Sequence, residues 1–239
     1  MFEHFRRFDI QTSDPQVKIH GVVGGSGPPV LLLHGNPLTH VHWHLVAPRL
    51  ARHFTVVATD LRGYGDSSKP RGLPDHSNYS FRRMAQDQVD VMSRLGFETF
   101  CVAGHDRGGR AAFRMALDQP DKVLRIATID IIPTHYVLAH ITREWALNSY
   151  HWFFMAQPYD IPEKLFEGKE GYYIEKIGES SSGTFSLAIT DAGDILQYTV
   201  KNKYGVPNQP SETILVTSVW DVDVKYNVKN DSKVYQQKG

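Results

Sequence analysis

Cysteine is almost absent from this 239-residue sequence, and neither sign of charge is in excess. The one cysteine, Cys101, cannot form a disulfide within the chain, which favours a reducing compartment. The 26 basic residues are balanced by 26 acidic ones, so the net charge gives no argument for binding nucleic acid or an anionic membrane. We therefore expect a cytoplasmic protein with no nucleic-acid or membrane partner.

Long apolar runs and metal-ligand clusters are lacking as well. No segment is long and apolar enough to span a bilayer, and residues 1–8 mix charged and aromatic side chains where a signal peptide would be apolar. No group of histidine, cysteine or acidic residues has the spacing of a metal site. The sequence therefore implies neither a metal nor an organic cofactor.

What the sequence does contain is a regular alternation of short apolar segments and amphipathic ones. This order predicts an α/β fold with a mostly parallel, doubly wound sheet covered by helices on both faces. Gly96 is a suitable stop for the first helix. The predicted strands are Val17–Val23, Val30–Leu33, Phe54–Ala58, Phe100–Ala103 and Val123–Ile129, and the predicted helices are Phe81–Leu95 and Arg110–Leu117.

The pattern changes after residue 133 and again near residue 178. Residues 134–177 are aromatic and helical in pattern, as expected for a lid over the carboxyl edge of the sheet. The Ser- and Gly-rich residues 178–183 resemble a linker, and residues 184–239 form a β-rich tail. We predict that this tail does not complete the sheet of the core, residues 1–133. Its expected strands are Thr184–Ile189, Ile195–Val200 and the alternating segment Val222–Val228.

The segment Gly104–Gly108 carries the clearest chemical signal. It lies where a buried strand ends and a helix begins, and its central residue is Asp106. A strand-to-helix turn of the form G-x-nucleophile-x-G raises a reactive side chain above the sheet. A carboxylate at that point can displace a leaving group from a saturated carbon and form an ester.

Several longer motifs appear in the order found in one known superfamily. Over about residues 17–177 the chain resembles the α/β hydrolases, and most of all the fluoroacetate (haloacetate) dehalogenases. The resemblance implies an α/β-hydrolase fold with a helical lid and hydrolytic cleavage of a carbon–halogen bond in a 2-haloacid. It is also compatible with a homodimer. The motifs are His34-Gly35-Asn36-Pro37, the run from Asp60 to Ser67, the elbow followed by Gly109-Arg110, the run from Asp130 to Thr134, and Tyr150-His151-Trp152.

The same resemblance assigns roles to individual residues. Asp106 would be the nucleophile and Asp130 the acid that orients a catalytic histidine. Arg107 and Arg110 would bind the substrate carboxylate, and His151 and Trp152 would donate N–H groups to the departing halide. The loop of His34, Gly35 and Asn36 would contribute to an oxyanion or halide site, although a backbone-turn role for Asn36 is equally consistent. The resemblance also implies a lid tyrosine in the halide pocket, for which the candidates are Tyr172, Tyr173 and Tyr198.

A histidine that activates water is expected late in such a chain, yet no histidine follows His151. His105 and His34 are poor substitutes, because the first points away from the nucleophile and the second has a structural place in its loop. Either the tail is unrelated to the superfamily or turnover has been lost, and the change of pattern favours the first. Two other functions stay open. One is an epoxide hydrolase using lid tyrosines such as Tyr136, Tyr150 and Tyr159, and the other is a non-catalytic protein that binds small carboxylates.

Overall fold

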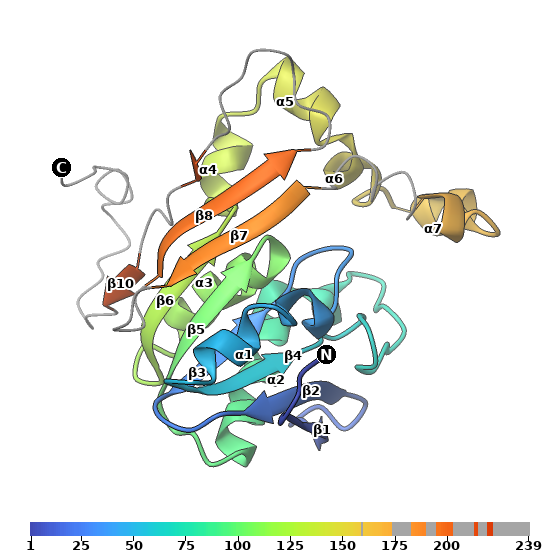
Figure 1. Cartoon of the computed structure of the whole chain (residues 1–239). Coiled ribbons are helices and arrows are strands. Elements are labelled where there is room, and N and C mark those ends of the chain that lie inside the picture. Colours follow the sequence, from blue (N-terminus) through green and yellow to red (C-terminus); the bar gives the residue numbers. More distant parts are fainter. Residues whose placement is uncertain (159, 174–182, 190–194, 203–212, 215–218, 222–239) are drawn as a thin grey trace.

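A seven-stranded sheet forms the centre of the computed structural model, which describes residues 1–158, 160–173, 183–189, 195–202, 213–214 and 219–221. The strand order is β1-β2-β4-β3-β5-β6-β10 (Figure 1). Strands β4, β3, β5 and β6 are parallel to one another, and the outer strands pair antiparallel, which confirms the mostly parallel sheet. The bounds are β1 Arg6–Gln11, β2 Lys18–Gly24, β3 Pro29–Leu33, β4 Thr55–Thr59, β5 Phe100–His105, β6 Val123–Ile129 and β10 Val219–Asp221.

Both faces of the sheet are buried, because alternate residues of β3 pack into two different apolar clusters. Leu31 and Leu33 belong to the apolar cluster formed with helices α2 and α3. Val30 and Leu32, which point the other way, belong to the cluster formed with η1 and α1. A central strand buried on both sides must be apolar at every position, and β3 is. The helices are η1 His40–Trp43, α1 Ala47–Leu50, η2 Ser77–Tyr79, α2 Phe81–Arg94 and α3 Arg107–Asp118.

The expected strands and helices of the core are present, with two differences. Helix α3 begins at Arg107, three residues before the predicted start, because the turn at Asp106 leads directly into it. Strand β1 was not predicted. It is an edge strand in which Phe8 is buried and the flanking residues are charged, so its sequence lacks the apolar run that marks the inner strands.

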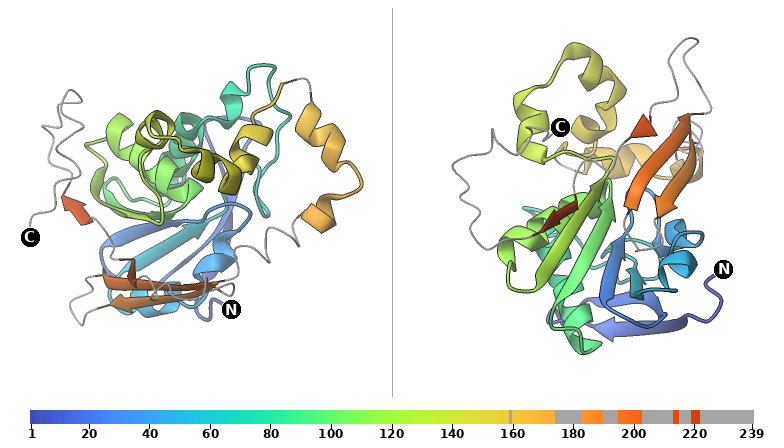
Figure 2. Two further views of the ribbon diagram at one scale, coloured as in Figure 1. Left: turned by 90° about the horizontal axis from the view of Figure 1, so that it is seen from above. Right: turned by 60° about the vertical axis from the view of Figure 1, so that its left-hand side comes forward.

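The described part of residues 134–173 is helical. These helices are α4 Thr134–Ala139, α5 Arg143–Asn148, α6 Tyr150–Phe154 and α7 Ile161–Phe166. The two views of Figure 2, together with Figure 1, show α3 against one face of the sheet and α4–α6 beyond the ends of β5 and β6. The carboxyl ends of parallel strands are where ligands of open α/β sheets bind, so these helices stand over the expected ligand side.

The C-terminal segments divide between two sheets. Strands β7 (Gly183–Ile189), β8 (Ile195–Asn202) and β9 (Thr213–Ile214) form a separate antiparallel sheet, in which β7 and β8 match the first two strands predicted for the tail. Of the described tail segments, β10 is the one that joins the core sheet, where its three residues pair antiparallel with β6 at the sheet edge. That the tail does not complete this sheet stays a prediction. The linker residues 178–182 and the predicted strand 222–228 lie outside the described residues.

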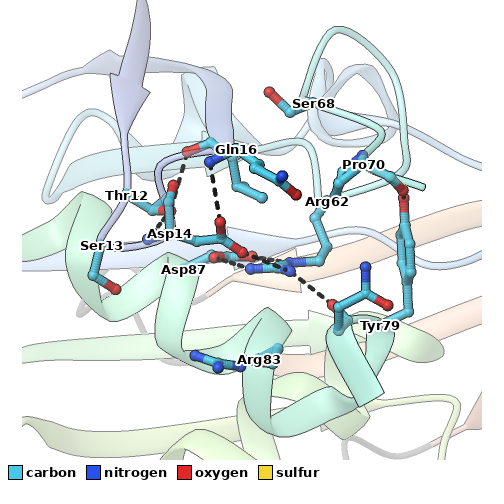
Figure 3. A network of polar contacts seen from close by, with 12 residues as sticks. Thr12, Ser13, Asp14, Gln16, Arg62, Ser68, Pro70, Tyr79, Arg83 and Asp87 are labelled. Carbon is cyan, nitrogen blue, oxygen red and sulfur yellow. Dashed lines mark hydrogen bonds and ion pairs between the residues drawn. The ribbon is translucent and has the colours of Figure 1, made fainter. Parts of the chain in front are cut away.

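The loop after β4 is anchored by a buried ion pair. Arg62 donates from Nε to Asp87 Oδ2 and from Nη2 to Asp87 Oδ1, each at 2.6 Å, and from Nη1 to the Asn78 carbonyl at 2.7 Å. Asp14 adds a longer contact of 3.3 Å to Nη1 (Figure 3). These bonds join the loop to α2 and to the turn after β1, so its backbone has a fixed place beside the ends of the central strands.

Candidate active site

Asp106 occupies the sharp turn between β5 and α3. Its φ of 49° and ψ of −117° lie in a region that costs a non-glycine residue about 1–3 kcal/mol. The Asp106 N–H donates to the Ile129 carbonyl at 3.1 Å, and the Arg110 N–H donates to the Asp106 carbonyl at 3.2 Å. The surrounding backbone thus imposes the strained conformation, which holds the carboxylate at the ligand side of the sheet.

Glycine is needed around this turn because other backbone passes close to it. A Cβ on Gly104 would collide with the backbone of Gly108, and a Cβ on Gly35 would lie 2.6 Å from the Asp106 Cβ. The elbow and the loop after β3 therefore pack against each other. The Asn36 N–H uses this proximity and donates to Asp106 Oδ1 at 3.0 Å.

Arg107 and Arg110 extend from the first turn of α3 between aromatic rings. The Arg107 Cζ lies 5.1 Å from the centre of the Phe81 ring, and the Arg110 Cζ lies 3.9 Å from that of Trp152 and 6.0 Å from that of Phe81. Among the described residues, the buried Nε of each arginine and the buried Nη2 of Arg110 have no hydrogen-bond partner. Burial lowers the pKa of Arg110, although the Asp106 carboxylate acts in the opposite direction. Stacked cations with unused donors are suited to bind an anion.

His151 and Trp152 lie on α6 and close this group of residues from the lid side. Burial lowers the pKa of His151, while the negative charge of Asp106 acts to raise it. A neutral imidazole still has one N–H to donate. Trp152 covers Arg110 on one side and meets Trp145 edge-on at 5.0 Å on the other. Trp152 thus lies against Arg110, and His151 lies near enough to Asp106 to be affected by its charge; their role in halide binding stays a prediction.

The loop after β3 is held by its own histidine. His34 is fully buried, and its Nε2 accepts a hydrogen bond from the Leu61 N–H at 3.0 Å. Its Nδ1 therefore carries the proton and donates to the Gly35 carbonyl at 2.8 Å. Burial lowers the pKa of His34. Both ring nitrogens are thus bonded to backbone, which holds the loop after β3 in place; a part for this loop in an oxyanion or halide site stays a prediction.

Asp130 follows β6 and has a φ of 51°. Its carboxylate lies 3.9 Å from the Nε2 of His105, the residue before the nucleophile. The His105 ring stacks on His42 with ring centres 5.0 Å apart. Burial lowers the pKa of His42 to about 3, and His105 adds to this effect. The acid expected to orient a catalytic histidine thus meets His105 among the described residues.

A family model for the alpha/beta hydrolase fold matches residues 28–205 of the chain. The chain belongs to the α/β-hydrolase family. A fluoroacetate dehalogenase from Burkholderia sp is 55% identical to this chain over 175 residues, which are 73% of the chain and 57% of that protein. A soluble epoxide hydrolase from Corynebacterium sp. (strain C12) is 45% identical over 116 residues, 48% of the chain and 39% of that enzyme.

A solved structure shows the same fold. An alpha/beta hydrolase from Nostoc sp PCC 7120 superposes with a TM-score of 0.74 and 52% identity, covering 77% of this protein and 62% of that chain. The chain thus spans less than two thirds of the length of each of these relatives. No helix in the described parts of the chain has the length and hydropathy needed to cross a membrane. Within the same parts, no group of three or more His, Cys, Asp or Glu side chains is placed to hold a metal ion.

Three residues of the candidate site were not singled out from the sequence. Phe81 was assigned only as the start of a helix, Tyr64 only as part of a motif, and His42 not at all. Their positions depend on contacts between segments 20 or more residues apart, for which one sequence gives no signal. Of the tyrosines proposed for the lid pocket, Tyr172 is 65% exposed, Tyr173 packs on Phe166 at 4.1 Å, and the Tyr198 side chain lies outside the described residues.

Proposed function

We propose that this hydrolase displaces halide from the saturated carbon of a small 2-haloacid, with Asp106 as the nucleophile. The observation that carries the proposal is the pair of arginines beside Asp106, whose buried N–H groups lack partners among the described residues. A substrate carboxylate would supply those partners through two parallel charge-assisted bonds to a guanidinium. It would also bring the carbon next to the carboxyl group close to Asp106.

The reaction follows from this placement. An oxygen of Asp106 attacks the carbon that bears the halogen, a C–O bond forms as the carbon–halogen bond breaks, and the halide leaves with the bonding electrons. His151 and Trp152 donate N–H bonds to the halide, whose charge develops only as the bond breaks. Arg107 and Arg110 offset the repulsion between two carboxylates. The product of this step is an ester on Asp106.

Release of that ester needs a base that activates water, which the family resemblance assigns to a histidine oriented by Asp130. No histidine follows His151 in the 239 residues. We therefore assign the ester-forming step to the described site and test that step alone.

Intact-mass measurement after incubation with chloroacetate tests the proposal. We expect the mass to rise by one carboxymethyl group, with chloride released in equal amount and the modified peptide containing Asp106. The uncharged analogue chloroacetamide should react with Asp106 far more slowly, and Asp106→Asn should give no adduct on that peptide. Absence of both adduct and chloride release with the wild-type protein would refute the assignment.

Substitution of Arg110 tests the carboxylate contact directly. Arg110→Lys keeps the positive charge but loses the planar pair of donors, so the chloroacetate concentration for half-maximal ester formation should rise about 10- to 100-fold. The matched control is Arg114→Lys, one helical turn later, whose guanidinium pairs with Asp118 away from the site. Equal effects of the two substitutions would contradict the carboxylate-binding role.

Epoxide hydrolysis is the second candidate, favoured by the 45% identity to the soluble epoxide hydrolase. Its ring-opening step would use Asp106 in the same way, with lid tyrosines as proton donors. Tyr136 stacks on His140 at 4.1 Å and Tyr150 is 57% exposed, whereas Tyr159 lies outside the described residues. A panel of neutral epoxides discriminates, because ester formation with these and not with chloroacetate would favour this candidate. A carboxylate that raises the melting temperature without any adduct would instead indicate a binding protein.

A further inference from the structure

We propose that Tyr64 is a positioning residue for the nucleophile. Its hydroxyl fixes the side chain of Asn36, and the backbone of Asn36 in turn holds the Asp106 carboxylate in one orientation. The inference rests on the proposed role of Asp106 as nucleophile. It gives the Asn36 side chain a role beyond the oxyanion or halide site and the backbone turn that the sequence analysis considered.

Two hydrogen bonds in series connect the three residues. The Tyr64 hydroxyl donates to Asn36 Oδ1 at 3.0 Å, and the Asn36 N–H donates to Asp106 Oδ1 at 3.0 Å. Because the Asn36 N–H engages Oδ1 of Asp106, the other carboxylate oxygen of Asp106 is left for attack. Because the Tyr64 hydroxyl engages Oδ1 of Asn36, the Asn36 side chain is tied to the loop after β4 and is not free to rotate.

Tyr64 itself is held firmly enough to act as an anchor. Its ring meets the buried His34 ring edge-on at 5.1 Å, and its N–H donates to the Leu61 carbonyl at 3.0 Å. The Leu61 N–H in turn donates to His34 Nε2. The buried Arg62–Asp87 pair then fastens the same loop to α2. The Tyr64 carbonyl also accepts from the Ser67 N–H at 3.0 Å, so the phenol projects from backbone that is held on both sides.

Burial keeps the Tyr64 hydroxyl in the donating form. Burial raises the pKa of Tyr64, and the nearby Asp106 carboxylate acts in the same direction, while Arg107 opposes them. A protonated phenol can donate to Asn36 Oδ1 at neutral pH. The position of Arg107 beside the phenol places Tyr64 between the carboxylate-binding arginine and the loop that holds the nucleophile.

Amide hydrogen exchange of Asn36 tests the bond series without reference to activity. In the wild-type protein the Asn36 N–H should be protected, and Tyr64→Phe should accelerate its exchange by about tenfold, the order expected for loss of one neutral hydrogen bond. Asn36→Ala removes the acceptor, keeps the N–H, and should have the same effect. Tyr79→Phe is the matched control, because its hydroxyl bonds to the Pro70 carbonyl outside the site. Protection that survives both Tyr64→Phe and Asn36→Ala would overturn the proposal.

Ester formation with chloroacetate then tests positioning. Tyr64→Phe and Asn36→Ala should each slow the maximal rate by about 10- to 100-fold, since small misplacement of a nucleophile is costly, with little change in the half-saturating concentration. The double variant should be no slower than the single ones, because both act through one connection. The proposal would be refuted if the rate losses of the two single variants multiplied in the double variant, or if Tyr64→Phe formed the ester at the wild-type rate. If the wild-type protein forms no ester at all, the proposed function fails, while hydrogen exchange still decides whether Tyr64 holds the Asn36 loop.

Discussion

Replacement of Asp87 by asparagine is expected to remove a large share of the stability of this protein. Arg62 is 1% exposed and Asp87 2%, and two hydrogen bonds of 2.6 Å join them. Asparagine has nearly the same shape but no charge, so Arg62 stays buried and charged without its main counter-ion. Removing one partner of a buried ion pair costs about 3–5 kcal/mol.

Neighbouring groups decide where in that range the cost falls. The Asn78 carbonyl keeps its bond to Arg62, and Asp14 lies 3.3 Å from Nη1 with a side chain 25% exposed. Both offset part of the lost charge, so we expect a loss of about 3 kcal/mol. For a domain of this size each kcal/mol lowers the melting temperature by about 2–4 °C, which predicts a fall of about 6–12 °C. Because the total free energy of unfolding of native domains is about 5–15 kcal/mol, the expected loss is a large fraction of it.

Urea denaturation followed by circular dichroism measures the difference in unfolding free energy. Asp118→Asn is the control, because Asp118 pairs with Arg82 and Arg114 on the surface, where ion pairs contribute about 0–1 kcal/mol. A loss below about 1 kcal/mol in Asp87→Asn, or an equal loss in the control, would refute the reasoning. Replacing both partners with apolar residues of similar volume should restore much of the stability, since no buried charge is then unpaired.

Three further predictions concern the elbow, its histidines and the lid. Gly104→Ala should destabilise the protein by about 1–3 kcal/mol in urea denaturation, because its Cβ would meet backbone, whereas Gly171→Ala, with open space around it, should not. Since burial lowers the pKa of His42 to about 3, the unfolded chain binds a proton that the folded chain does not as pH falls from 6.5. As pH is lowered, the free energy of unfolding should therefore decrease by up to about 1.4 kcal/mol per pH unit because of this residue. His42→Gln should flatten that slope, and an unchanged slope in this variant would contradict the prediction. Trp152→Phe keeps an aromatic face near Arg110 but removes the indole N–H, so ester formation should slow by about 10- to 100-fold. Trp145→Phe, which alters the edge-on contacts with Trp152 and Phe153, should change the rate of ester formation little, and equal slowing by the two substitutions would argue against halide binding.

Much of the fold could be predicted from the sequence because it is encoded in local patterns. Continuous apolar segments at β3 and β5 are typical of strands buried on both faces, and α2 shows the helical period with its glycine stop. Strand β1 was missed because an edge strand buries little. The pairing of β10 with β6 was missed because strand partners far apart in sequence leave no local mark.

The sequence by itself determined the chemistry available at the site: an aspartate on a strained elbow, two arginines after it, and a His-Trp pair in the lid. Those residue types lie within short motifs, and each motif has a physical reason that can be recognised locally. Only the tertiary structure decided which groups meet, because the chain must fold before Phe81 and Trp152 stack on Arg110, or Tyr64 reaches Asn36. It also paired Asp130 with His105, a contact that depends on two neighbouring strands ending at the same edge of the sheet.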